Sequence, residues 1–254
     1  MRLFDSHSHL DAPEFDGDRG PVIDRAQGDG VFEQLVPAVT CAAWPKLRDV
    51  CRSRPGLHAA YGLHPMFLDS HQPAHLDSLR QWIESERPVA IGECGLDFFQ
   101  PGLDPETQRF YFRAQLEIAR DCGLPVVVHA RRAVEEVIAT VRSVGGLSGV
   151  VHSYPGSEEQ ARQLYDLGFL LGIGGPVTYE RAGRLRRLVA AMPLDRLLLE
   201  TDSPDQPDSL HRGQRNEPAR LAAVLGVVAQ LRGAEPADIA LATSSNARRL
   251  FGIH

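Results

Sequence analysis

Eight short apolar segments, separated by helical patterns, constrain the fold of this chain more than any other feature. Their near-continuous hydrophobic character is typical of strands that are buried on both faces of a parallel sheet. The segments are Arg2–Phe4, Gln34–Val39, His58–Leu63, Val89–Ile91, Val126–Val128, Gly149–Val151, Phe169–Ile173 and Arg196–Leu199. Eight such units in 254 residues predict one α/β domain over residues 1–254, a (β/α)8 TIM barrel.

The helical patterns carry recognisable start and stop signals. Asp104 followed by a proline predicts the start of a helix that ends before Gly123, and Ser157 with Gln160 forms a capping-box pattern. The expected helices are Asp104–Cys122, one from Ser157 to Gly168, Thr178–Met192, Glu217–Arg232 and Pro236–Phe251. The rival fold, an open doubly wound sheet, favours a glycine-rich loop after the first strand. Here the glycine-rich segment, residues 172–175, accompanies the seventh strand instead.

Composition indicates the cellular compartment and excludes some binding and metal chemistry. A net charge of −6 argues against a protein that coats duplex nucleic acid. The four cysteines form no CxxC pair, and no signal peptide precedes the charged start. No apolar run has the length of a membrane span. We therefore expect a reduced, cytoplasmic protein without a membrane partner. Lys46 is the only lysine, which disfavours a metal site bridged by a carboxylated lysine.

Residues that can bind metals follow the apolar segments. The set is His7, His9, Glu93, His129, His152 and Asp202, and His64 ends the third segment. The carboxyl ends of barrel strands form the active-site face, so these side chains are expected to converge there. Four imidazoles and two carboxylates exceed the needs of one ion and are suited to two of Zn²⁺, Mn²⁺, Fe²⁺ or Ni²⁺. The other histidines, at 58, 71, 75, 211 and 254, are expected to be structural or on the surface.

Motifs along nearly the whole chain make the sequence resemble one known family. They are Asp5-Ser-His-Ser-His-Leu-Asp11, Gly62-Leu-His-Pro65, Ile91-Gly-Glu-Cys-Gly-Leu-Asp97, Val128-His-Ala-Arg131, Val151-His152, Gly172-Ile-Gly-Gly175, Leu199-Glu-Thr-Asp-Ser-Pro204 and Arg212-Gly followed by Asn216-Glu-Pro218. In this combination and order they resemble the TatD family of metal-dependent hydrolases, within the amidohydrolase-like superfamily.

The resemblance implies a role for each candidate residue. His7, His9 and Asp202 correspond to ligands of a first divalent ion, and His129 and His152 to ligands of a second. Glu93 corresponds to the bridge between the two ions, which are Mg²⁺, Mn²⁺ or Zn²⁺. His64 and Arg131 correspond to residues that contact phosphate, and Asp202 with Glu93 to the catalytic pair. Asp5, Asp97 and Glu200 are expected to orient the ligands.

The resemblance also implies a phosphodiester substrate, most simply DNA with single-stranded or frayed ends cut in the 3′→5′ direction, and no obligate protein partner. The sequence departs from the family pattern at residues 153–156 and 205–207, which puts the substrate preference in question. Two alternatives remain open. One is hydrolysis of a small amide, lactone or aminoacyl ester by the same metals, and the other is a metal-binding scaffold with vestigial activity.

Several residues near the strand ends have two interpretations. Arg131 either binds phosphate or forms a surface pair with Arg132 at a helix start. Four aromatic residues either stack on a base or, as we expect, pack the top of the barrel; they are Phe98, Phe99, Tyr154 and Tyr179.

Overall fold

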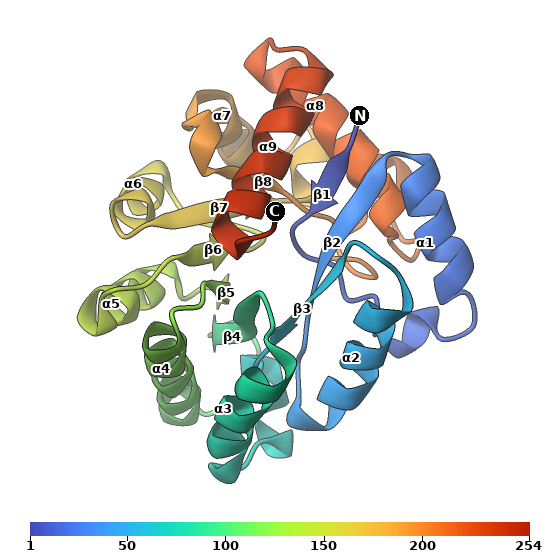
Figure 1. Cartoon of the computed structure of the whole chain (residues 1–254). Helices are drawn as coiled ribbons and strands as arrows, with labels where there is room; N and C mark the ends of the chain where they lie inside the picture. Colours follow the sequence, from blue (N-terminus) through green and yellow to red (C-terminus); the bar gives the residue numbers. More distant parts are fainter.

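Every strand pairs in parallel with the next strand along the chain, in a computed structural model that describes residues 1–254 (Figure 1). The strands are β1 (Leu3–Asp5), β2 (Val31–Pro37), β3 (Leu57–Tyr61), β4 (Ala90–Asp97), β5 (Val126–Arg131), β6 (Gly149–Val151), β7 (Phe169–Ile173) and β8 (Leu197–Leu199). A helix follows each strand, so the predicted (β/α)8 TIM barrel is confirmed.

Backbone hydrogen bonds just beyond the ends of β1 and β8 bring the two edges of the sheet together. The Ser6 amide donates to the Leu199 carbonyl at 2.9 Å, and the Asp202 amide donates to the His7 carbonyl at 2.8 Å. The segment that follows β1 therefore lies against the segment that follows β8. This contact places His7 and Asp202 side by side, although they are far apart in the sequence.

The α-helices are α1 (Arg19–Gly28), α2 (Trp44–Ser53), α3 (Ala74–Glu86), α4 (Pro105–Cys122), α5 (Val134–Val144), α6 (Glu158–Asp166), α7 (Gly183–Ala191), α8 (Leu221–Arg232) and α9 (Pro236–Phe251). Two of the α-helices, α4 and α6, begin at the capping residues that the sequence indicates. The Thr107 amide donates to the Asp104 side chain at 2.8 Å, and Ser157 and Gln160 form the predicted capping box. None of the helices combines the length and the apolar character that a membrane span requires.

One buried side chain from each strand fills a layer inside the barrel. The eight residues are Phe4, Leu35, Ala60, Ala90, Val127, Val150, Leu170 and Leu198. Ala247 and Phe251 of α9 pack against this layer, and α9 lies across one end of the ring of strands (Figure 1). The opposite end of the barrel, at the carboxyl ends of the strands, carries the polar residues. A larger cluster of 52 buried residues packs the helices against the outside of the barrel.

Several expected boundaries differ from the structure. The second strand spans Val31–Pro37 rather than Gln34–Val39, and the third spans Leu57–Tyr61 rather than His58–Leu63. The helix expected over Thr178–Met192 begins only at Gly183, because residues 175–178 form a 3-10 turn and the Tyr179 hydroxyl donates to the Pro207 carbonyl at 3.0 Å. The helix expected from Glu217 begins with a 3-10 turn over residues 218–220. The fourth strand extends to Asp97, so that Glu93 lies within it rather than at its end.

Candidate metal centre

The structure brings the six predicted metal ligands, and His64 with them, into one cluster at the carboxyl ends of the strands. Three overlapping groups of residues could each hold an ion, because the ligand atoms within each group lie within 4.8 Å of one another. The groups are His7 with Glu93 and His152, His7 with His9 and Asp202, and His64 with Glu93 and His129. Because His7 and Glu93 each belong to two groups, the three groups form one continuous centre.

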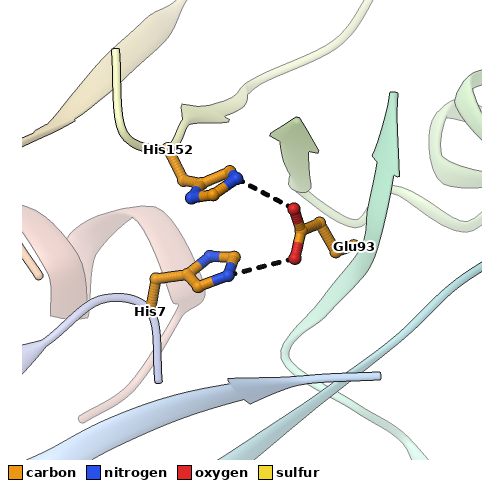
Figure 2. A group of neighbouring side chains, drawn as sticks. All are labelled: His7, Glu93 and His152. Atoms are coloured by element: carbon orange, nitrogen blue, oxygen red, sulfur yellow. Dashed lines mark ion pairs between the residues drawn. The ribbon is translucent and has the colours of Figure 1, made fainter. Parts of the chain in front are cut away.

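Glu93 is the middle of this cluster. Its Oε1 atom lies 2.8 Å from Nε2 of His152, and its Oε2 atom lies 3.1 Å from Nε2 of His7 (Figure 2). His129 Nδ1 and His64 Nε2 approach the same Oε1 atom at 3.1 and 3.0 Å. Burial alone would raise the pKa of Glu93, but the surrounding imidazoles hold that pKa well below its usual range. The carboxylate is therefore ionised, and each of its two oxygens faces imidazole nitrogens.

Two glycines explain how β4 can aim Glu93 into the barrel mouth. The pairing of β4 with β5 is irregular between Ile91 and Cys94, and Gly92 and Gly95 on either side of Glu93 have φ values of 145° and 147°. A side chain at Gly92 would meet Val127 of β5 at 2.7 Å. Glycine is thus required there for the irregular strand to approach its neighbour closely.

Asp202 completes the other side of the cluster from the loop that follows β8. Its Oδ1 atom lies 3.5 Å from Nε2 of His7 and 3.6 Å from Nε2 of His9. The side-chain amide of Gln206 donates to the second oxygen of the same carboxylate. Asp202 has a left-handed backbone with φ of 55°, and the preceding Thr201 is anchored to the buried Asp5 through its amide at 3.0 Å and its hydroxyl at 2.6 Å. The loop therefore holds one carboxylate oxygen toward the imidazoles.

Hydrogen bonds at the outer nitrogens fix where two of the imidazoles carry their protons. His129 Nε2 lies 3.0 Å from Asp97 Oδ2, and hydrogen bonds from His129 and two amides bring the pKa of Asp97 to about 2 although burial opposes this. An ionised carboxylate only accepts, so Nε2 of His129 is protonated, and in the neutral ring its Nδ1 lone pair faces inward. His9 Nδ1 likewise donates to the Pro37 carbonyl at 3.2 Å, which in the neutral ring leaves its Nε2 lone pair facing inward.

Inward-facing nitrogens approach one another closely inside the cluster. The Nε2 atoms of His7 and His9 are 3.2 Å apart, and so are Nδ1 of His129 and Nε2 of His152. Converging lone pairs repel unless a proton or a cation lies between them. Imidazole nitrogens and carboxylate oxygens are the donors that Zn²⁺ and Mn²⁺ accept. The side chains present therefore fit divalent cations, and Glu93 is placed to be shared.

His64 differs from the other imidazoles in its proton arrangement. The Met66 amide donates to Nδ1 of His64 at 3.1 Å, so the proton of the neutral ring is on Nε2, which points at Glu93. Burial lowers the pKa of His64 to about 4, which keeps the ring neutral. A protonated nitrogen has no free lone pair, so this tautomer makes His64 a hydrogen-bond donor rather than a ligand. The buried His71 supports it by donating to the His64 carbonyl at 2.9 Å.

Arg131 is the one predicted site residue that the structure does not bring into contact with the cluster. Its guanidinium carbon lies 3.7 Å from the ring centroid of Phe99, and no carboxylate is within ion-pair distance of it. Phe99 is 42% exposed, so the expectation that it packs the barrel top is wrong, whereas Tyr154 is buried as expected. Lys46 pairs with Asp16 at 2.7 Å and takes no part in the centre.

Comparison with known proteins matches the chain to one family. Residues 4–252 match the family described as TatD related DNase. The chain belongs to this family of metal-dependent hydrolases. The Escherichia coli metal-dependent hydrolase YjjV is 39% identical over 99% of this chain and 98% of its own length. The 3′-5′ ssDNA/RNA exonuclease TatD of Erwinia billingiae is 36% identical over 98% of both chains. The crystal structure of YjjV superposes with a TM-score of 0.95 over 100% of this chain and 99% of that chain.

The two segments that we expect to depart from the family pattern, residues 153–156 and 205–207, touch each other in the structure. The Ser153 hydroxyl donates to Oε1 of Gln206 at 2.7 Å, and Gln206 in turn contacts Asp202. The Asn216 amide binds the carbonyls of Thr201 and Asp205, both at 2.8 Å, and so fixes the loop that carries Gln206. Sequence reasoning missed the contact of Gln206 with Asp202, and only the departure from the family pattern drew attention to these segments.

Proposed function

We propose that the protein hydrolyses phosphodiester bonds of nucleic acid strands with the help of two divalent cations. The observation that carries this proposal is the position of Glu93. Its Oε2 atom faces Nε2 of His7 and of His9 at 3.1 and 3.4 Å, and its Oε1 atom faces His129 and His152 at 3.1 and 2.8 Å. A carboxylate shared in this way is typical of two-metal sites that cleave phosphate esters. The same arrangement is what a bridging role for Glu93 requires.

The ligands divide between the two cations according to their contacts. His7, His9 and Asp202 would hold the first ion, and His129 and His152 the second. Mg²⁺, Mn²⁺ and Zn²⁺ are the candidates, and the four imidazoles favour Mn²⁺ or Zn²⁺ over Mg²⁺. When bound, such ions act as Lewis acids toward a phosphoryl oxygen and lower the pKa of an attacking water.

The side chains of the cluster supply the remaining steps. Asp202 has one oxygen toward His7 and His9, so it would orient the attacking water and accept its proton. His64 presents an N–H group beside Glu93 and would donate it to a phosphoryl oxygen of the substrate. Arg131 would bind a neighbouring phosphate, because its guanidinium has no carboxylate partner and rests on the exposed ring of Phe99.

The substrate class rests on charge and on relatives. The protein carries a net charge of −6, so its affinity for phosphate would come from the cations and from arginines near the barrel mouth. The relative from Erwinia billingiae is named a 3′-5′ exonuclease of single-stranded DNA and RNA. We therefore propose single-stranded or frayed nucleic acid ends as the substrate, cut from the 3′ end.

An end-labelled oligonucleotide assay tests this function. Wild-type protein with Mg²⁺, Mn²⁺ or Zn²⁺ should shorten strands labelled at the 5′ end, one nucleotide at a time. The variant Asp202→Asn should keep its circular dichroism spectrum and lose turnover. Hydrolysis of small esters, lactones or amides without any cleavage of oligonucleotides would overturn the proposal, as would the absence of turnover on every substrate.

A further inference from the structure

A cavity of about 360 Å³ opens beside the metal centre, where the loops after β6 and β7 face the start of α7. Its wall includes Ser153, which directly follows the candidate ligand His152. A side chain at Gly172 in the same wall would run into the carboxylate of Glu200, which accepts a hydrogen bond from the Ser153 amide. The cavity therefore lies at the barrel mouth, next to the proposed metal centre.

Two arginines at the edge of this cavity lack acidic partners. Arg181 and Arg184 line the cavity, and neither has a carboxylate oxygen within 4.0 Å, unlike Arg109 and Arg215, which pair with acids. Arg184 donates to the Pro155 carbonyl at 2.6 Å, which holds its side chain across the opening. Arg181 lies 5.4 Å from the ring centroid of Tyr179. In an acidic protein, two unneutralised guanidinium groups at one cavity favour an anionic ligand.

The rest of the cavity wall is largely apolar or glycine. Tyr154, Pro155, Pro176 and Leu185 are among the residues that line it. Apolar walls with a few placed charges are typical of small-molecule sites, which range over roughly 300–1,000 Å³. At the lower end of that range, the cavity has the size to hold a single nucleotide.

We propose that this cavity binds one nucleotide of the strand whose phosphodiester bond lies at the metal centre. Arg181 and Arg184 bind its phosphate, and the apolar wall contacts its base. The inference rests on the proposed nuclease function and adds a subsite to it. Residues 153–156, where the chain departs from the TatD pattern, form part of this wall, so the departure changes which nucleotide the subsite prefers rather than the chemistry at the centre.

Equilibrium binding separates the subsite from catalysis. The probe is a short fluorescein-labelled oligothymidylate with phosphorothioate linkages, measured by anisotropy on the metal-loaded protein. The variant pair Arg181→Ala and Arg184→Ala, made singly and together, removes the charges, and Ala182→Trp fills the cavity. Arg187→Ala is the matched control. Arg187 is an exposed arginine of α7, the helix that carries Arg184, and it does not line the cavity.

The double arginine variant should bind the probe about tenfold more weakly, since charge-assisted hydrogen bonds to a phosphate are lost. The slope of log affinity against log salt should fall by about 0.7 for each phosphate contact removed. Ala182→Trp should weaken binding without changing that slope. Bis(nitrophenyl) phosphate is small enough to reach the metal centre without the cavity. Its kcat/KM should therefore stay within about twofold of wild type in all these variants. Probe binding by the control Arg187→Ala should also stay within about twofold of wild type.

Wild-type affinity for the probe in both the double arginine variant and Ala182→Trp would overturn the subsite, even if the wild type proves to be a nuclease. Equal losses on the oligonucleotide and on bis(nitrophenyl) phosphate would also overturn it, because they indicate damage to the metal centre. Binding of the probe that depends on Arg181 and Arg184, without cleavage of any phosphodiester, would support the subsite and refute the nuclease function.

Discussion

The Nε2 atom of His129 lies 3.0 Å from Oδ2 of Asp97, and this contact sets which nitrogen of His129 is free for a metal. Replacing Asp97 by Asn keeps an oxygen for the amides of Phe99 and Gln100, which Asp97 now binds at 2.9 and 3.0 Å. The new amide would donate to Nε2 of His129 and move the ring proton to Nδ1, toward Glu93. Asp97→Asn should therefore weaken the binding of one metal ion by about 10–100-fold, measured by competition with a chromophoric chelator.

Asp104→Asn provides the matched control for this prediction. Asp104 caps α4 through an oxygen that Asn retains, and it lies on the same connection between β4 and α4. Its replacement should leave the metal affinity unchanged. If Asp97→Asn also binds both ions as tightly as wild type, the proton arrangement assigned to His129 is wrong.

His64→Ala should lower turnover without releasing metal. The proton on Nε2 of His64 makes the ring a donor, so its removal costs transition-state stabilisation of about 10²–10³-fold in kcat. Metal content after equilibrium dialysis, measured by mass spectrometry, should equal that of wild type. Loss of one ion from the His64→Ala protein would show that His64 is a ligand instead.

Ser153 and Gln206 should act on Asp202 as a unit. Gln206→Ala removes the amide that holds Asp202, and Ser153→Ala removes the hydroxyl that orients Gln206 at 2.7 Å. We expect each single variant to lower kcat more than KM changes, and the double variant to resemble Gln206→Ala alone. The coupling energy from the cycle should be about 0.5–3 kcal/mol. Strict additivity of the two losses would contradict a connected chain of hydrogen bonds.

Metal removal should destabilise the fold. The cluster buries the carboxylates of Glu93 and Asp202, and bound cations would stabilise the native state by about 2.7 kcal/mol at a hundredfold excess over Kd. Chelation should then lower the melting temperature by about 5–10 °C, and added Mn²⁺ or Zn²⁺ should restore it. Asp202→Asn should show a smaller shift. An identical melting curve with and without chelator would speak against metals at this site.

The barrel and the members of the cluster could be predicted because both depend on local sequence. Each apolar run marks a strand, and the ends of parallel strands meet at one face, so His129 and His152 had to be neighbours. Capping residues are also local signals, and they predicted where α4 and α6 begin. The family motifs then supplied the roles that the residue types alone left open.

Tertiary contacts decided what the sequence could not predict. The pattern over residues 178–192 is helical in period, yet Tyr179 is held by a hydrogen bond to the loop after β8, and α7 starts only at Gly183. The contact between Gln206 and Asp202 depends on left-handed backbone at both residues, with φ of 49° and 55°, for which neither residue type gives a clear signal. Arg131 was placed near phosphate by its motif, but its stacking on Phe99 is a property of the folded surface.

The number of ions held through Glu93 tests the central claim most directly. Equilibrium dialysis against Mn²⁺ or Zn²⁺, followed by mass spectrometry of the metal content, should give two ions per chain for the wild type. Glu93→Gln, which keeps the shape of the side chain and loses its charge, should retain at most one. A wild type that saturates with a single ion, or a Glu93→Gln variant that still binds two with wild-type affinity, would contradict the shared-carboxylate centre.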